Sequence, residues 1–262
     1  MSKQTALITG ATSGIGYELA TIHAQNKFNL VLVARNASRL LVVKKELEST
    51  FGIEVLTFPC DLSQPENIKK LTDFTDKQLF RIDHLVNNAG IGVFGKLWVT
   101  NLDDHLKLIQ LNVNALVSLT HHYSEKMVNN GTGKVLNVAS TAAFMPGPFM
   151  STYFASKAFV LSFGEAVHSE LDGTGVTVTT LCPGPTETGF EAAASGMKKS
   201  GLFTKSKVAS PYEVAKDGYD TMMKGKSLVI SGWVNKFNAF SIRLSPRNMV
   251  TAITKSIMKP MD

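Results

Sequence analysis

Tyr153 and Lys157, four residues apart, are the pair in this sequence best suited to acid-base chemistry. On a helix this spacing places both side chains on one face, one turn from each other. A free tyrosine titrates near pKa ~10, so lowering its pKa to about 7 needs roughly 4 kcal/mol of differential stabilisation, of which a nearby ammonium can supply part. The same spacing also occurs in helices where a solvated lysine simply lies beside a half-buried ring. Other residues must therefore decide whether this pair is catalytic.

Ser140 lies thirteen residues before Tyr153, at the end of the apolar segment KVLNVAS. Such a segment predicts a buried strand. The Ser140 hydroxyl could then hold a substrate oxygen beside the phenol.

The elements that must position these residues alternate between strand-like and helix-like patterns along most of the 262 residues. With 44% hydrophobic residues, no linker and no repeat, the chain predicts one α/β domain over 1–262: a Rossmann-type doubly wound parallel sheet with helices on both faces. The two cysteines, Cys60 and Cys182, end apolar runs and indicate buried free thiols in a reducing compartment, which favours the cytoplasm.

A glycine-rich turn follows the first predicted strand, residues 6–9, and leads into a helical pattern. Glycines there let backbone N–H groups approach a pyrophosphate, and the helix N-terminus favours its charge. The spacing Thr-Gly-x-x-x-Gly-x-Gly differs from G-x-G-x-x-G and resembles the form found in short-chain dehydrogenases/reductases. The residues of this turn expected to bind a dinucleotide are Gly10, Thr12, Ser13, Gly14, Ile15 and Gly16.

The second predicted strand, residues 29–34, ends in Ala34 and is followed by Arg35. Sites that prefer NAD usually carry an acidic residue here, which would repel a 2'-phosphate. Arg35 could instead grip that phosphate with two hydrogen bonds, so the sequence predicts NADP(H). The alternative is an arginine at an exposed turn, and Arg39 is a weaker second candidate.

The resemblance supplies further cofactor residues. It implies that Asp61 meets the adenine edge with the Leu62 backbone alongside, although Asp61 before Ser63 could equally cap a turn or a helix. In the segment Asn-Asn-Ala-Gly, it implies that Asn87 ties the sheet together, and that Asn88, Ala89 and Gly90 pass beside the cofactor ribose.

The catalytic asparagine of the family matches Asn112 in Asn112-Val113-Asn114-Ala115. Asparagine is a poor residue for a helix interior, so its presence asks for a reason. The resemblance implies a local helix break that holds a water connecting Lys157 to solvent, with Asn114 as the alternative.

After the predicted strand 176–182, the resemblance assigns the nicotinamide carboxamide and nearby phosphate to Pro183, Gly184, Thr186 and Thr188. It also implies that the apolar loop 144–150 borders the substrate, unless it packs on a partner subunit, and that residues of about 189–210 form a substrate lid.

The formal charge is +6, and from Lys198 onward twelve Lys/Arg stand against four Asp/Glu. The basic amphipathic tail of about 233–262 is expected to pack on the protein or another subunit, with peripheral membrane contact as the alternative. No apolar run reaches about 18 residues, so we expect no transmembrane segment. We also expect no signal peptide, metal or nucleic-acid partner, and a homodimer or homotetramer.

The resemblance covers residues 9–188 and implies hydride transfer between NADP(H) and a carbonyl or secondary alcohol with an apolar portion. Tyr153 would move the proton, Ser140 would hold the oxygen, Lys157 would lower the tyrosine pKa and bind the nicotinamide ribose, and Asn112 would maintain the water path. Two alternatives stay open: a reductase of carrier-bound 3-oxoacyl groups, and a catalytically silent NADP-binding sensor or scaffold.

Overall fold

The structure is a computed structural model that describes residues 3–78, 80–188 and 208–259. Its seven strands are all parallel and form one sheet in the order β3-β2-β1-β4-β5-β6-β7. The strands are β1 (Thr5–Thr9), β2 (Asn29–Ala34), β3 (Val55–Pro59), β4 (His84–Asn87), β5 (Gly133–Val138), β6 (Val176–Cys182) and β7 (Leu228–Ile230). The doubly wound sheet predicted from the sequence is confirmed.

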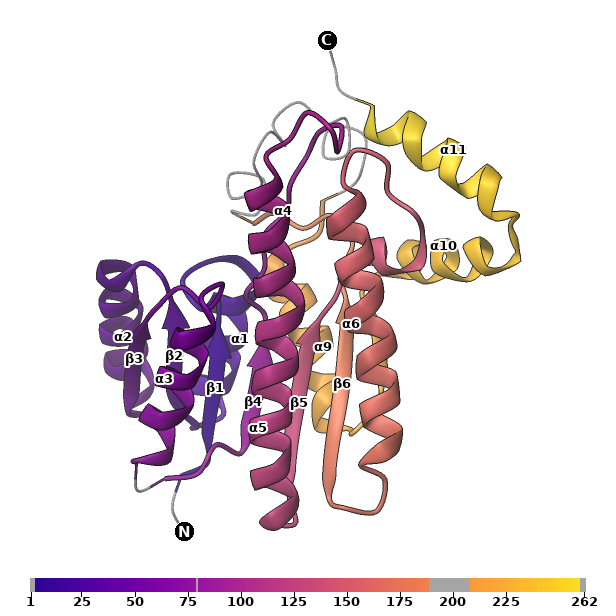
Figure 1. Cartoon of the computed structure of the whole chain (residues 1–262). Helices are drawn as coiled ribbons and strands as arrows, with labels where there is room; N and C mark the ends of the chain where they lie inside the picture. Colours follow the sequence, from indigo (N-terminus) through magenta and orange to yellow (C-terminus); the bar gives the residue numbers. More distant parts are fainter. Residues whose placement is uncertain (1–2, 79, 189–207, 260–262) are drawn as a thin grey trace.

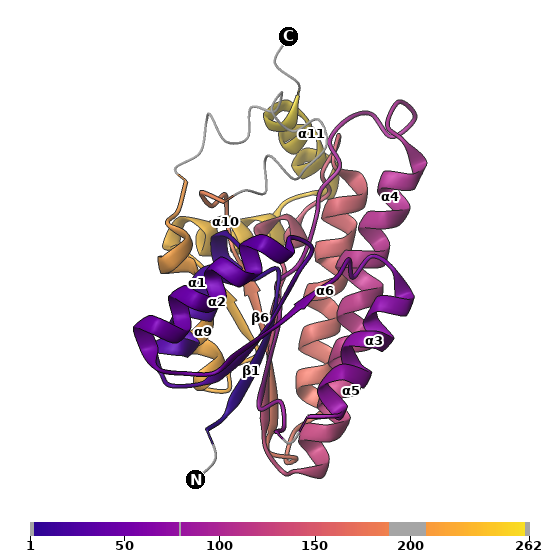
Figure 2. The same cartoon turned by 90° about the vertical axis from the view of Figure 1, so that its left-hand side faces the viewer.

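Helices cover both faces of this sheet (Figures 1 and 2). On one face lie α1 (Gly14–Gln25), α2 (Ala37–Phe51) and α9 (Pro211–Met223). On the other lie α3 (Pro65–Asp76), α5 (Leu116–Asn129) and α6 (Ser151–Glu170). The strand order reverses between β1 and β4, and connections leave that point in opposite directions, which opens a crevice at the carboxyl edge of the sheet.

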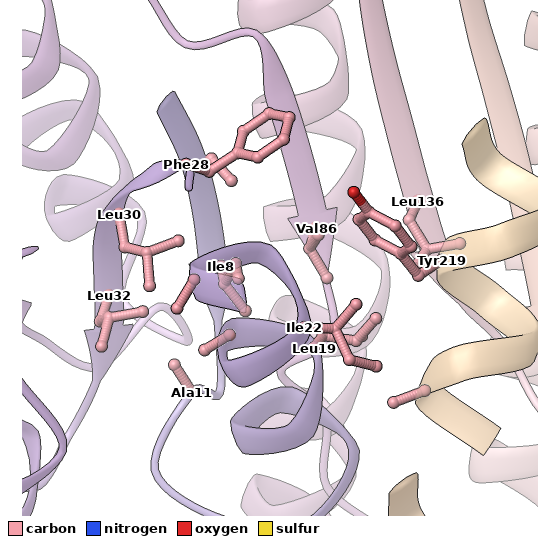
Figure 3. Close-up of a cluster of buried hydrophobic side chains, with 14 of the residues drawn as sticks. Ile8, Ala11, Leu19, Ile22, Phe28, Leu30, Leu32, Val86, Leu136 and Tyr219 are labelled. Carbon is pink, nitrogen blue, oxygen red and sulfur yellow. The ribbon is translucent and has the colours of Figure 1, made fainter. Parts of the chain in front are cut away.

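The side-chain alternation of the strands divides the core into two layers. Ile8 and Leu32 point into the layer under α1 and α9, drawn in Figure 3, whereas Leu7 and Val31 point into the layer under α3 and α5. All four side chains are fully buried. A central sheet that is apolar on both faces holds the strand ends, and therefore the loops after them, in fixed positions.

Two strands end just before predicted cofactor residues. β3 ends at Pro59, because its ladder partner β2 ends at Ala34, opposite Pro59, so Asp61 and Leu62 lie in the loop that follows. β4 covers His84–Asn87 only, so Asn88 to Gly90 belong to the loop at the carboxyl edge. The predicted cofactor residues at these two strand ends therefore lie in loops that can approach a ligand.

After the loop that follows β4, the chain forms one long helical stretch with a wider turn in its middle. It runs as α4 (Leu102–Ile109), the π-helical turn η1 (Gln110–Ala115) and α5. The short helix η2 (Thr141–Phe144) follows β5, and the tail forms α10 (Trp233–Leu244) and α11 (Arg247–Met258), broken at Pro246. Both tail helices lie beside the carboxyl end of the sheet (Figure 1). Residues 189–207 of the expected lid lie outside the described residues.

Candidate active site

A cavity of about 530 Å³ opens at the carboxyl edge of the sheet, above the reversal between β1 and β4. A volume of this size suits a cofactor and part of a substrate. All the residues predicted from the sequence line it except Gly16 and Asn112. Those that line it are Gly10, Thr12, Ser13, Gly14, Ile15, Arg35, Asp61, Leu62, Asn88, Ala89, Gly90, Ser140, Tyr153, Lys157, Pro183, Gly184, Thr186 and Thr188.

The glycine-rich turn is built for a close approach of backbone to ligand. Gly10 and Gly14 have φ of +67° and +55°, which favour glycine. Ser13 precedes α1 without a capping hydrogen bond from its side chain, so the first N–H groups of the helix remain available to an anion. A Cβ on Gly16 would lie 2.3 Å from the Gly10 carbonyl oxygen, so only glycine at this position lets the turn fold this tightly. These features fit a pyrophosphate.

The cavity end near β2 and β3 carries the residues expected around the adenosine. Arg35 is exposed on the cavity wall, and the Asn36 side chain caps α2 by accepting a hydrogen bond from the Arg39 backbone, 3.0 Å long. Arg39 Nε reaches back to the Thr12 carbonyl at 3.4 Å. No carboxylate occurs at residues 34–36, so this end of the cavity offers a cation to a ligand.

Asp61 both lines the cavity and organises its own turn. Its carboxylate accepts hydrogen bonds from the backbone and the hydroxyl of Ser63, 3.0 and 2.8 Å long, and lies 3.3 Å from Lys107 Nζ. Burial raises the pKa of Asp61, but the Ser63 hydrogen bonds and the Lys107 ammonium outweigh it, and the net pKa is lowered. The two sequence interpretations of Asp61 are therefore compatible.

The end of β4 is tied to the glycine-rich turn. Asn88 Nδ2 donates to the carbonyls of Thr9 and Gly10 at 3.0 and 3.2 Å, and the Thr9 hydroxyl accepts from the backbone N–H groups of Asn88 and Ala89. Asn87 points into the protein instead, donating to Thr120 and Asn137. Asn87 is thus structural, as the sequence indicated, and Asn88 fixes one wall of the cavity.

Asn112 lies in the π-helical turn η1, buried just behind the cavity. Its amide exchanges two hydrogen bonds of 3.0 Å with the backbone of Ile91 and donates a third, of 3.1 Å, to Ser156 Oγ. Asn114 instead is exposed and bonds to Gln110 on its own helix. The expected helix break at Asn112 is confirmed, and of the two asparagines only Asn112 connects the β4 loop with α6.

Ser140, Tyr153 and Lys157 meet on the cavity wall. Ser140 follows β5 and caps η2, accepting from the Ala142 N–H at 3.1 Å, and it shares a hydrogen bond with Tyr153 from α6. Lys157 Nζ donates to the Val138 carbonyl at 2.8 Å and lies 5.8 Å from the centre of the Tyr153 ring. The pairing expected from the four-residue spacing is present, and the turn after β5 supplies Ser140.

Burial dominates the acidity of both ionisable groups. It raises the pKa of Tyr153 to about 12, against the opposing effect of the Ser140 hydrogen bond, and it lowers the pKa of Lys157 to about 8. Withdrawing a phenolate from water outweighs the opposing Ser140 hydrogen bond, and the expectation that Lys157 lowers the phenol pKa stays a prediction. A charge in the cavity could reverse that balance.

The turn after β6 closes the cavity beside the glycine-rich turn. A Cβ on Gly14 would lie 2.8 Å from Thr188 Cγ2, so these two residues are in close contact. A Cβ on Gly184 would lie 2.4 Å from Asn235 Nδ2, so glycine is required there for α10 to pack against this turn. Cys182 is a buried free thiol, as expected, whereas Cys60 is only half-buried and lines the cavity.

The remaining wall comes from η2, α6 and the tail. Apolar side chains dominate it, with an amide and a hydroxyl from the tail: Met145, Met150, Phe154, Asn238, Ile242, Thr254, Ile257 and Met258. The loop 144–150 was expected here and contributes Met145 and Met150. Sequence reasoning missed the tail residues, although Asn235, Asn238 and Ile242 recur at helical spacing and two asparagines on the inner face of a helix are unusual.

The comparisons identify the family. The sequence profile described as short chain dehydrogenase matches residues 4–199. The chain belongs to the short-chain dehydrogenases. Among curated members it is 30% identical to a 7β-hydroxysteroid dehydrogenase of Collinsella aerofaciens, over 88% of this chain and 86% of that protein. It is also 30% identical to the ketoacyl reductase HetN of a Nostoc species, over 80% of this chain and 74% of that protein.

A solved short-chain dehydrogenase from Sphingobium yanoikuyae, in complex with NADPH, superposes with a TM-score of 0.82 at 29% identity, covering 91% of this chain and 92% of that one. This short-chain dehydrogenase is therefore an oxidoreductase of carbonyl and alcohol groups that uses a nicotinamide cofactor. Within the described ranges no helix is long and apolar enough to span a membrane, and no group of three potential ligands could hold a metal ion.

Proposed function

We propose that this short-chain dehydrogenase is an NADP(H)-dependent reductase or dehydrogenase whose substrate carries an apolar portion. The observation that carries the proposal is the meeting of Ser140, Tyr153 and Lys157 on the wall of the cavity that also holds the glycine-rich turn. The whole chain is taken as one catalytic domain, since its strands form a single sheet, with residues of about 189–210 as a substrate lid.

Each residue has a separate role in carbonyl reduction. The bound nicotinamide supplies the hydride. Tyr153 gives its phenolic proton to the oxygen of the substrate, which Ser140 holds by a hydrogen bond. Lys157 orients the nicotinamide ribose and favours the phenolate once the proton has left. Asn112, bonded to Ile91 and Ser156, holds the π-helical turn in place. Water at this turn would carry a proton from solvent to Lys157, to replace the one that Tyr153 has given up.

The preference for NADP(H) rests on the end of β2. Ala34 and Asn36 carry no charge there, and Arg35 lies exposed on the cavity wall, where it can bind a 2'-phosphate. Arg39 is held back by the Thr12 carbonyl and is the lesser contributor. The NADPH complex of the Sphingobium yanoikuyae protein supports the same choice.

The apolar character of the substrate follows from the apolar part of the cavity wall, which includes residues packed beside Tyr153. Met145, Met150, Phe154 and Ile242 line it, while Asn238 offers one amide to a polar group. A bulky alicyclic or aromatic ketone suits this wall because burying its apolar surface favours binding. The resemblance to a 7β-hydroxysteroid dehydrogenase supports a substrate of this class.

A second candidate is the reduction of 3-oxoacyl groups on an acidic carrier. The 30% sequence identity to a ketoacyl reductase and the basic tail of this chain favour this reaction.

The exposed apolar residues Leu102 and Leu106 of α4 support a homodimer or homotetramer. The two free thiols support a location in the cytoplasm.

The test follows the absorbance of NADPH and NADH with aliphatic, aromatic and steroid-like carbonyls and with carrier-linked 3-oxoacyl thioesters. NADPH oxidation with bulky ketones supports the proposal. Turnover of carrier-linked thioesters alone supports the second candidate, and cofactor binding without turnover of any compound contradicts both.

A further inference from the structure

The helix α10 has two opposite faces with different surroundings. Its inner face carries Asn235, Asn238 and Ile242 into the wall of the cavity. Its outer face carries Trp233, Phe237, Phe240 and Leu244, whose exposed fractions are 80, 66, 63 and 75%. These four residues follow the i, i+4, i+7, i+11 spacing of one helical stripe. Four large apolar side chains in a row on a surface mark a contact site.

The next helix, α11, repeats this division. Val250, Thr254 and Met258 are buried against the protein, whereas Met249 and Ile253 are about half-exposed, at 49 and 53%. The expectation that the tail packs against the protein is thus correct for one face of each helix only. Both helices stand at one side of the molecule (Figure 1).

A loop beside α11 adds to the exposed apolar surface. Leu97, Trp98 and Val99 are exposed at 58, 81 and 72%. Phe94, at the start of the same loop, packs in one cluster with Met258 at the end of α11. The start of the loop therefore lies against the end of α11, where Met258 also lines the cavity.

The charge of the tail indicates which partner covers this surface. Residues 233–259 contain no Asp or Glu and five cations, which are Lys236, Arg243, Arg247, Lys255 and Lys259. A symmetric contact between two copies would bring this patch against itself and place like charges together. A surface of anionic lipid would instead neutralise the cations while accepting the aromatic side chains.

We propose that the outer faces of α10 and α11 bind the surface of an anionic lipid bilayer, with the aromatic stripe in the headgroup region and the cations at the phosphates. Because the inner faces of the same helices line the cavity, this binding places the wall of the substrate site against the lipid. The binding itself does not depend on the proposed reaction.

Cosedimentation of the full chain with vesicles tests the proposal. The protein should bind vesicles of phosphatidylcholine mixed with phosphatidylglycerol, and added salt should weaken binding because it screens the cations. Phe237→Ser/Phe240→Ser should reduce the bound fraction at least about tenfold, since the apolar stripe provides most of the insertion. Lys236→Gln/Arg243→Gln should reduce binding to the anionic vesicles.

The matched control is Leu41→Ser/Val42→Ser, a half-exposed apolar pair on α2, far from the tail in sequence and on another helix. It should bind as the wild type does. Equal binding of the Phe237/Phe240 variant, with folding verified by circular dichroism, would overturn the proposal, as would equal binding to vesicles of pure phosphatidylcholine. Tyr153→Phe should bind the anionic vesicles as the wild type does. The proposal of lipid binding therefore does not depend on the proposed catalytic function.

Tryptophan emission separates lipid from a second copy of the chain. The sequence has two tryptophans, so Trp98→Phe leaves Trp233 as the only reporter. Its emission should shift to the blue when anionic vesicles are added and stay constant as protein concentration rises without lipid. A shift that depends on protein concentration alone would mean that a second copy covers the stripe, and the proposal would be wrong.

Discussion

The Lys157 ammonium lies 5.8 Å from the centre of the Tyr153 ring, one turn away on α6, and donates its hydrogen bond to the Val138 carbonyl. The ammonium and the phenol ring are thus neighbours, and the ammonium donates a hydrogen bond to the backbone of β5. Burial pushes both towards their neutral forms, with pKa values of about 12 and about 8. A charge that enters the cavity would therefore change the pKa values of both groups.

Tyr153→Phe should lower kcat by about 10²-fold or more, because general acid catalysis typically contributes 10²–10⁴-fold. Binding of NADPH, measured by fluorescence titration, should change little because the aromatic ring remains. Tyr212→Phe on α9, a half-exposed tyrosine, is the control and should keep full activity. Near-wild-type turnover of Tyr153→Phe would exclude the phenol as the proton donor.

Lys157→Met should reveal the cost of burying the ammonium. Between pH 8 and 10.5 the unfolded chain binds a proton at Lys157 that the folded chain has released, so wild-type stability should rise with pH across this window relative to the variant. The change amounts to about 3 kcal/mol, at about 1.4 kcal/mol per pKa unit. Urea unfolding of both proteins at several pH values measures it, and parallel curves would contradict the shift.

Arg35→Asp should reverse the cofactor preference. The variant loses the charge-assisted contact to the 2'-phosphate, worth about 10- to 100-fold in affinity, and repels that group. KM for NADPH should rise while KM for NADH falls or stays constant. Arg39→Gln is the comparison and should have a smaller effect, and an unchanged NADPH preference of Arg35→Asp would assign the phosphate to another residue.

Asn112→Ala should lower both activity and stability. It removes three hydrogen bonds from a buried amide and leaves the Ile91 backbone groups without their partner, which costs about 1–3 kcal/mol for each buried group left unpaired. Asn114→Ala, two residues on in the same π-helical turn, removes only an exposed bond to Gln110. Thermal unfolding and steady-state kinetics should separate the two variants, and equal losses would contradict the assignment of Asn112.

The sequence by itself determined the parallel sheet, the glycine-rich turn and the proposed catalytic residues Ser140, Tyr153 and Lys157. Alternating apolar strands and helices specify a doubly wound sheet, and carboxyl ends of parallel strands gather at one edge, so motifs that follow strands meet there. The prediction that Tyr153 and Lys157 lie side by side needed only their four-residue spacing and the geometry of a helix.

The tertiary structure alone decided features that depend on distant neighbours. The family motif favoured Asn112 and left Asn114 as the alternative, and only the contacts of Asn112 with Ile91 and Ser156, which no local pattern reveals, separate the two. The raised pKa of Tyr153 comes from burial by several elements together. The two faces of α10 were likewise undecided, because an amphipathic pattern shows that a helix has sides but not which one the protein covers.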